Sequence, residues 1–255
     1  MQKRIIPIAL LFTTCFFINL SYAQLNDQRN QNAAISDSLV ALYRNGFGKS
    51  ERLYTGTEYM GYVRRPKGHP FFISDQFLPA TISFDGADYK DSILYDLVND
   101  VVVVSDPTEQ YNINVVNDKV KAFEVASHKF VRLDGIYLRL NQFEPGYYEE
   151  LYNGKLQVFV RHKKQINSHT VQSEVVSEYV QYDVYLIRKG EEFIRVFNNN
   201  SLLDALDDHR GEVRRFMHEQ NLDFRKDPVN TLRLVAAFFD GKSTIDESQN
   251  RRTNK

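Results

Sequence analysis

The side chains best suited to chemistry in this chain are carboxylates and histidines, and they are widely spaced. The densest group of potential metal ligands is Asp204, Asp207, Asp208 and His209. Oxygen ligands suit hard cations, and a histidine could complete a transition-metal site. Acidic residues near helix starts and polar residues in connectors explain the same group equally well. We therefore predict no metal site and no cofactor.

Two adjacent glutamates, Glu149 and Glu150, are the next candidates. Successive residues of a strand point to opposite faces, so these two cannot form a catalytic pair with each other. One of them could pair with Asp183 or Glu178 across a sheet, as glycosidases pair two carboxylates. The alternative is one solvated carboxylate and one at a sheet edge, and the spacing does not choose between them.

The recognised catalytic motifs are missing from the sequence. The histidines have no HExxH-like spacing, no G-x-S-x-G elbow occurs, and the only cysteine is Cys15. The run 46–50 contains the Gly-Lys-Ser of a phosphate loop, but Tyr43 stands where that loop needs glycine and a helix precedes it. The sequence alone does not decide whether serine, histidine and aspartate from distant positions form a catalytic site. The six histidines are His69, His128, His162, His169, His209 and His218.

Tyrosines are the more suggestive feature because they concentrate in two segments that we expect to be neighbouring strands. Tyrosine combines apolar area with a polar tip and is enriched in binding patches. It is also a good strand former, which explains the same residues without a function. We predict that six tyrosines line one face of a sheet or its mouth and bind a ligand or partner. They are Tyr147, Tyr148, Tyr152, Tyr179, Tyr182 and Tyr185.

The elements that must position these side chains are short strands joined by turns. Residues 80–133 alternate apolar and polar side chains between turn-forming pairs, which predicts an antiparallel meander. Residues 156–161 and 173–188 predict further strands, and 192–197 pairs back after a turn at Lys189-Gly190. The turn-forming pairs are Asp85-Gly86, Asn99-Asp100, Asn117-Asp118 and Asn153-Gly154.

Helices are expected at both ends of this sheet. Residues 35–43 have apolar residues at helical spacing. Ser201 and Asp204 match a capping pattern, Asp227-Pro228 begins the last helix, and Gly241 ends it.

We therefore predict an α+β fold, mostly an antiparallel β meander with a barrel or half-barrel-like sheet. An N-terminal helix and two or three C-terminal helices accompany this sheet. The expected order is a single domain over 24–241, with a β-rich part at 53–197 and a helical part at 201–240, and then a disordered tail at 242–255.

The first 23 residues match a secretory signal peptide. Lys3 and Arg4 precede an apolar run over 5–20, and Ser21-Tyr22-Ala23 provides small residues at the cleavage site. The apolar run is shorter than the roughly 20 residues a bilayer requires. It also continues beyond Cys15, unlike a lipoprotein signal. We predict export, with cleavage after Ala23 and a mature chain held by its core without disulfides.

Charge and hydropathy exclude two classes of partner. Without Lys3 and Arg4, 30 of the 32 basic residues face 33 acidic ones, giving a net charge of −3. Such a mixed surface argues against binding nucleic acid. No second apolar run is long enough for a transmembrane segment after signal cleavage.

The chain also resembles uncharacterised exported β-rich proteins of the Bacteroidota. The resemblance rests on residues 146–154 with the basic strand that follows, and on the run from Ser201-Leu202-Leu203 through Phe216 to Asn221-Leu222. It implies a periplasmic or outer-membrane-associated location and brings no catalytic residues with it.

These observations predict an exported, non-catalytic binding or carrier module of the cell envelope. Its partner would be an apolar or amphipathic ligand, or an envelope protein. One alternative is a scaffold or assembly partner of an envelope complex. The other is a hydrolase with a site dispersed in sequence. A deep apolar cavity would favour the carrier, an exposed aromatic patch on a filled core the scaffold, and a cleft with convergent carboxylates or histidines the hydrolase.

Overall fold

The computed structural model describes residues 52–63 and 66–253. The expected signal peptide and the helix predicted over residues 35–43 lie outside these ranges. All the strands and helices discussed below belong to one compact unit, Leu53–Lys255.

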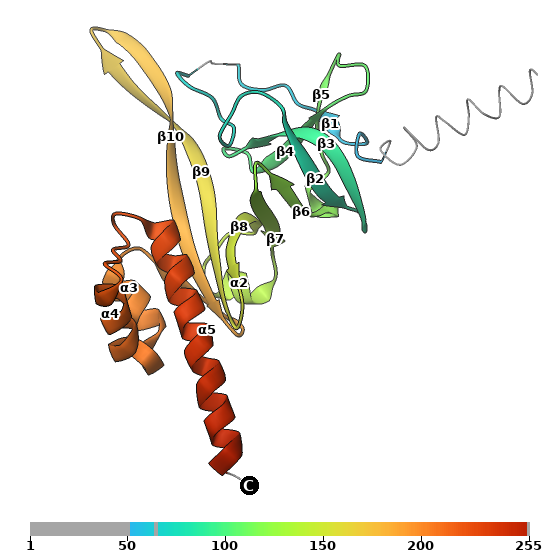
Figure 1. Cartoon of the computed structure of the whole chain (residues 1–255). Helices are drawn as coiled ribbons and strands as arrows, with labels where there is room; N and C mark the ends of the chain where they lie inside the picture. The colour runs from blue at the N-terminus through green and yellow to red at the C-terminus, as the bar shows by residue number, and fades with distance from the viewer. Residues whose placement is uncertain (1–51, 64–65, 254–255) are drawn as a thin grey trace, which may run out of the picture. The chain divides into compact units, whose positions relative to one another are not determined.

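The described chain is built on one antiparallel sheet of eleven strands (Figure 1). The strand order is β1-β5-β4-β3-β2-β6-β7-β8-β9-β10-β11, so most neighbours in space are neighbours in sequence. This confirms the predicted meander. The sheet is open, because no strand pairing among the described residues joins β1 to β11. The strands are β1 Thr57–Glu58, β2 Leu78–Phe84, β3 Ala87–Asp96, β4 Val101–Ser105, β5 Asn112–Asn114, β6 Val120–Val125, β7 His128–Leu133, β8 Gly146–Asn153, β9 Leu156–Val171, β10 Glu174–Lys189 and β11 Glu192–Val196.

The hairpin turns follow the predicted positions where glycine supplies the backbone geometry. Asp85 and Gly86 both have positive φ, 50° and 81°, which matches the twist of the flanking strands β2 and β3. Two further hairpins turn at Ala126-Ser127 and Gln172-Ser173 with positive φ and no glycine. Both of these turns are absent from the sequence prediction.

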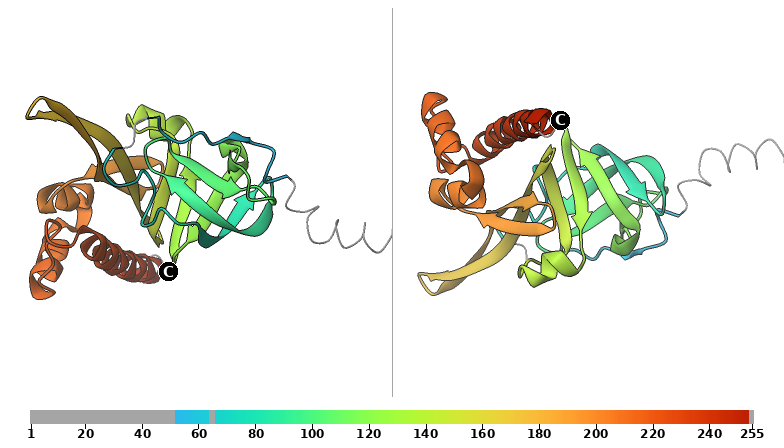
Figure 2. Two further views of the ribbon diagram at one scale, coloured as in Figure 1. Left: turned by 90° about the horizontal axis from the view of Figure 1, so that it is seen from above. Right: turned by 90° about the horizontal axis from the view of Figure 1, so that it is seen from below.

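Strands β2 to β8 curl around a core of aromatic rings (Figure 2). The ring centroids of Phe123 and Phe130 lie 4.8 Å apart, and those of Tyr95 and Phe130 lie 5.0 Å apart. Tyr147 packs edge-on against Phe123 at 5.1 Å. The space inside the curl is therefore occupied by side chains.

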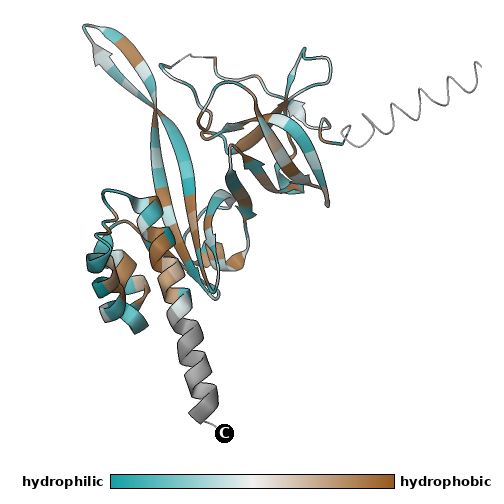
Figure 3. Ribbon diagram, in the orientation of Figure 1, coloured by the Kyte–Doolittle hydropathy of each residue, from teal (hydrophilic) through white to brown (hydrophobic). Residues whose placement is uncertain are grey.

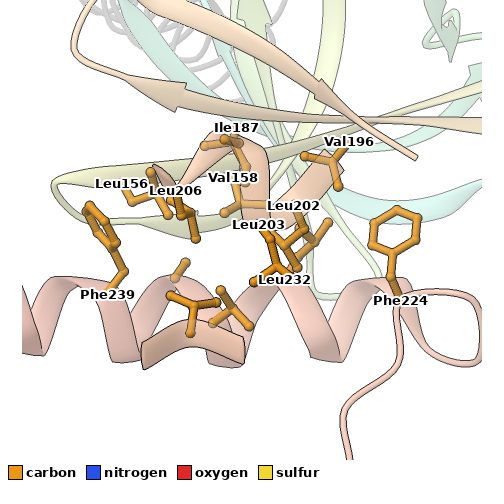
Figure 4. Close-up of a cluster of buried hydrophobic side chains, with 14 of the residues drawn as sticks. Leu156, Val158, Ile187, Val196, Leu202, Leu203, Leu206, Phe224, Leu232 and Phe239 are labelled. Atoms are coloured by element: carbon orange, nitrogen blue, oxygen red, sulfur yellow. The ribbon is translucent and has the colours of Figure 1, made fainter. Parts of the chain in front are cut away.

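The C-terminal helices cover the far part of the same sheet. Helices α3 Asn199–Ala205, α4 Arg210–Glu219 and α5 Pro228–Thr253 form a second apolar cluster with β8 to β11. Figure 4 shows Leu232 and Phe239 of α5 directed at the side chains of the sheet and of α3. Three C-terminal helices are thus present, as predicted. The remaining helical elements are η1 Asn117–Lys119, the short α2 Ile136–Leu140 and η2 Asp207–His209.

Two details of the helix ends differ from expectation. The cap of α3 is Asn198, whose Oδ1 accepts from the Ser201 amide at 2.8 Å while Ser201 Oγ accepts from the Asn198 amide at 3.0 Å. The predicted end of the last helix at Gly241 is wrong, because α5 continues to Thr253. The segment predicted as a disordered tail, 242–255, is therefore helical as far as that residue. Glycine inside a helix costs only about 1 kcal/mol, so it does not by itself end one.

The predicted start of α5 is confirmed, with Asp227 Oδ1 accepting from the Asn230 amide at 3.0 Å. No helix in the described ranges is both long enough and apolar enough to span a bilayer.

Candidate functional site

A row of four ionisable side chains crosses four adjacent strands. Glu149 of β8 accepts from His128 of β7 at 2.7 Å through Oε1, and it contacts His162 Nε2 of β9 at 2.8 Å through Oε2. His162 Nδ1 lies 2.8 Å from Asp183 Oδ1 of β10. The sequence left open a pairing of Glu149 or Glu150 with Asp183 or Glu178, and Glu149 with Asp183 was one of these possible pairs. The structure instead joins them through His162, whose position between them was not predicted.

Strand register brings these residues together. His162 lies directly opposite Asp183 in the β9–β10 ladder. Glu149 lies opposite Val160, two residues from His162 and hence on the same face. The side chains of Glu149 and His162 are each only 9% exposed.

The row is a buried, charged network. Burial alone would lower the pKa of His162, but hydrogen bonds and negative charge from Asp183 and Glu149 outweigh it and raise the pKa to about 9. Burial opposes the charged form of Glu149 as well, yet hydrogen bonds from His162 and His128 hold its pKa below the ordinary value. The pKa of Asp183 is lowered against burial by its hydrogen bond with His162. At neutral pH, His162 is therefore a cation between two carboxylates.

The middle of the row is buried beneath Phe72, while the side chains of His128 and Asp183 at its two ends are 39% and 28% exposed. The Phe72 ring lies 5.1 Å from the His128 ring and 5.2 Å from the His162 ring, measured between centroids. On β8, Glu149 separates Tyr147 of the aromatic core from Leu151 of the helix-covered cluster. The row lines neither of the two pockets described below. The four side chains of the row therefore form a line of polar groups between two apolar clusters.

A pocket of about 500 Å³ lies where residues 59–62 and 66–75 meet β10. We call it the tyrosine pocket, because three of its lining residues are tyrosines. Tyr62 and Tyr179 meet edge to face, with centroids 5.7 Å apart and planes at 77°. The lining residues are Tyr59, Met60, Gly61, Tyr62, Pro66, Gly68, His69, Pro70, Phe71, Asp75 and Tyr179.

A fully buried carboxylate fixes two of these rings. Asp96, at the end of β3, accepts from the hydroxyls of Tyr59 at 2.9 Å and Tyr62 at 2.7 Å. It also accepts from the amides of Val98 and Asn99. Burial and the Asp96 charge raise the pKa of both tyrosines, so their hydroxyls remain protonated donors.

The backbone of residues 67–71 is held in place against the sheet. Lys67 accepts from the Tyr179 amide at 3.1 Å and donates its own amide to the Ser177 carbonyl at 2.8 Å. The Lys164 ammonium donates to the carbonyls of His69 at 3.0 Å and Phe71 at 2.6 Å. These contacts pre-organise the pocket, so little ordering is left for a ligand to impose.

The six predicted tyrosines do not share one face. Tyr147 and Tyr148 are buried on opposite faces of β8, Tyr147 in the aromatic core and Tyr148 with its hydroxyl on the Glu144 carbonyl at 2.7 Å. Tyr179 belongs to the tyrosine pocket, and the 41% exposed Tyr182 lines a second pocket with Tyr148.

The other two predicted tyrosines support the helix-covered cluster. Tyr152 donates to Asp240 at 3.2 Å, and Tyr185 packs edge-on against Phe224.

Sequence reasoning missed the other half of the tyrosine pocket. Tyr59, Tyr62 and Phe71 lie outside the two tyrosine-rich segments. The sequence does contain a pattern that could have indicated this half, namely aromatic residues followed by Pro66, Gly68 and Pro70. Such a pattern is typical of an ordered segment that crosses a surface.

The acidic group near α3 pairs with basic side chains. Asp204 contacts Arg210, and Asp208 contacts Lys189 at 2.5 Å. Within residues 52–63 and 66–253, no three His, Cys, Asp or Glu side chains are placed to hold a metal ion.

No protein-family model, curated protein or solved structure matches this chain. The resemblance to exported proteins of the Bacteroidota stays a prediction, and function must be argued from the side chains themselves.

Proposed function

We propose that this protein is a non-catalytic binding protein that takes an apolar or amphipathic group in the tyrosine pocket. The observation that carries the proposal is the set of rings around that pocket, two of them fixed by buried Asp96. Rigid tyrosines provide large contact area at low entropic cost, with a hydroxyl at one end for polar groups.

The size and surroundings of the pocket support this. Its volume of about 500 Å³ lies within the range of small-molecule sites, about 300–1,000 Å³. Met60 in its lining and the nearby Val63 are strongly exposed and extend the apolar surface. A ligand with an apolar body and a polar end would contact rings, hydroxyls and these side chains together.

A ligand held inside the curled sheet, as in a carrier, is less well supported. Phe84, Phe123, Phe130 and Tyr147 are all buried in the curl and pack with neighbouring rings. Binding at the surface needs no rearrangement of this core, so we place the ligand in the tyrosine pocket.

Catalysis is not part of the proposal because the His128–Asp183 row does not line the tyrosine pocket. We further propose that the protein acts in the cell envelope, for which the support is the signal-peptide pattern of residues 1–23.

The proposal can be tested with N-phenyl-1-naphthylamine, an apolar dye that fluoresces when it leaves water. The wild-type mature chain should bind it saturably, and Tyr62→Ala or Tyr179→Ala should weaken binding about tenfold or more. Tyr111→Ala is the matched control, because Tyr111 is an exposed tyrosine away from the pocket. Circular dichroism confirms that each variant is folded. Equal affinities for wild type, Tyr62→Ala and Tyr179→Ala would refute the assignment of the pocket.

A second candidate function, a scaffold in an envelope complex, is favoured by the β9–β10 hairpin. β9 pairs with β8 only as far as Val160, and β10 pairs with β11 only from Tyr185, so the outer hairpin projects from the sheet (Figure 1). Figure 3 shows an apolar stretch near its tip, where Ile166, Val175 and Val176 are exposed. Exposed apolar residues on a projecting ribbon are typical of contact surfaces.

Cysteine crosslinking tests the scaffold function, since the predicted mature chain has no cysteine. A cysteine introduced by Val175→Cys should form a discrete adduct in the native envelope, and one introduced by Lys121→Cys, at an exposed position of β6, should not. The same adduct pattern from both variants would count against the hairpin as a contact surface.

A further inference from the structure

A second pocket, of about 240 Å³, lies beside β9, β10 and β11 at the connection between α2 and β8. Three cations line it, Arg161, Lys163 and Arg195, and we call it the cationic pocket. It is separate from the tyrosine pocket and shares no lining residue with it. The full lining is Gln142, Phe143, Glu144, Tyr148, Arg161, Lys163, Tyr182, Val184 and Arg195.

Arg161 is a built part of this pocket rather than a loose surface cation. Its side chain is 8% exposed and lies over the Tyr148 ring, 5.3 Å from the centroid. One Nη donates to Asp100 at 3.1 Å, and the other to the Glu144 carbonyl at 3.0 Å. Gly146 is required here, since a Cβ would lie 2.1 Å from Asp100 Oδ2 and its φ is 155°.

The carboxylate of Glu144, from the same chain, pairs with two of these cations on the exposed side of the pocket. Its Oε2 accepts from Lys163 Nζ at 2.7 Å and from Arg161 Nη1 at 3.2 Å. The hydrogen bond and charge of Lys163 lower the pKa of Glu144, so it is an anion at neutral pH. Its side chain is 68% exposed, and an exposed ion pair contributes little stability. Glu144 is therefore easily displaced by another anion.

Positive charge is in excess at this pocket. Asp100 and Glu144 pair with two of the cations, Arg161 and Lys163, while Arg195 makes no ion pair with any described residue. The planar guanidinium of arginine matches carboxylate and phosphate groups, which accept two parallel hydrogen bonds.

We propose that the cationic pocket binds an oxyanion group, a carboxylate or a phosphate, of a small ligand. The incoming oxyanion replaces the Glu144 carboxylate on Lys163 and Arg161 and gains Arg195 as a further partner. Phe143, Tyr182 and Val184 supply an apolar wall for the carbon atoms next to the charged group. At about 240 Å³, the pocket suits such a group rather than a large ligand.

Titration calorimetry with two probes, inorganic phosphate and benzoate, tests this proposal. Arg195→Gln and Lys163→Met should each weaken binding about tenfold, as expected for loss of a charge-assisted hydrogen bond. Glu144→Gln should strengthen binding, because it removes the competing charge. Arg188→Gln is the matched control: Arg188 is on β10, outside the pocket, and donates to Gln157 and Gly190.

The opposite effects expected for Arg195→Gln and Glu144→Gln on anion affinity distinguish a specific site from general surface charge. Saturable binding of either probe with this pattern supports the pocket, and the tighter probe identifies the preferred oxyanion. Tyr62→Ala should leave phosphate binding unchanged, which separates this site from the tyrosine pocket. No saturable binding at millimolar concentrations overturns the proposal. So does an equal loss in Arg188→Gln and Arg195→Gln, or weaker binding by Glu144→Gln.

Discussion

Replacing His162 with alanine removes the imidazole that joins Glu149 to Asp183 across β8 to β10. The two carboxylates are then left in partly buried positions with their shared cation gone. Breaking a buried ion pair by removing one partner typically costs about 3–5 kcal/mol. We expect His162→Ala to lower the free energy of unfolding by that amount at neutral pH.

The pH dependence gives an independent estimate of the same interaction. A rise in the pKa of His162 from 6.5 in the unfolded chain to about 9 in the fold corresponds to about 3 kcal/mol. Because the folded pKa is raised, this contribution is fully present below pH 6.5 and is lost as the pH rises through about 9. The lowered pKa values of Glu149 and Asp183 act at the acid end, where stability falls as these carboxylates are protonated.

Urea unfolding at a series of pH values measures both effects. The wild type should lose about 3 kcal/mol of stability between pH 6.5 and alkaline pH, and His162→Ala should lack this slope. His169→Ala is the control, because His169 is exposed on the outer part of β9. A cost below about 1 kcal/mol for His162→Ala, with the alkaline slope intact, would refute the charged row.

Two further predictions concern stability. Gly146→Ala should lower the free energy of unfolding by about 2 kcal/mol or more, because the new Cβ meets Asp100 and Arg161 at a positive φ; thermal unfolding against Gly211→Ala, a position with open space, measures it. Asn198→Ala should lower the free energy of unfolding by about 1 kcal/mol, because it removes the cap of α3. Asp204→Ala should change it by less than about 0.5 kcal/mol. If urea unfolding gave the reverse order, the capping pattern predicted from the sequence would be correct instead.

Local backbone chemistry made part of the fold predictable. Asp85-Gly86 and Asn153-Gly154 mark hairpins because such pairs are typical of short turns between strands, and both hairpins are present, although only Asp85 and Gly86 adopt positive φ. The turns at Ala126-Ser127 and Gln172-Ser173 carry no such mark. Their positive φ values are imposed by the strands that they join.

The length of β9 was harder to predict, because its outer half is not buried in the core. Residues 156–161 were predicted as a strand, but β9 continues to Val171. The apolar alternation stops where the hairpin leaves the sheet, so the outer residues look like a basic loop in the sequence. Pairing with β10, not burial, keeps them extended.

The candidate site depended on register, which one sequence does not specify. Glu149 and Asp183 could be suggested as partners, but placing His162 between them requires the β8–β9 register, which shifts between Glu150 and Tyr152. The split of the tyrosines, in contrast, follows from the sequence itself, because the strand period sends the adjacent Tyr147 and Tyr148 to opposite faces. The tyrosine pocket needed a segment distant in sequence to reach Tyr179.

The most direct test of binding at the tyrosine pocket is a chemical-shift map. The isotope-labelled mature chain is titrated with N-phenyl-1-naphthylamine, and its backbone amide signals are followed by NMR. We expect the largest shifts to cluster at Tyr62, Gly68, Phe71 and Tyr179, and we expect Asp96→Asn to reduce them by loosening the rings. Largest shifts at Phe123 and Phe130, inside the curled sheet, would contradict it and point to a carrier.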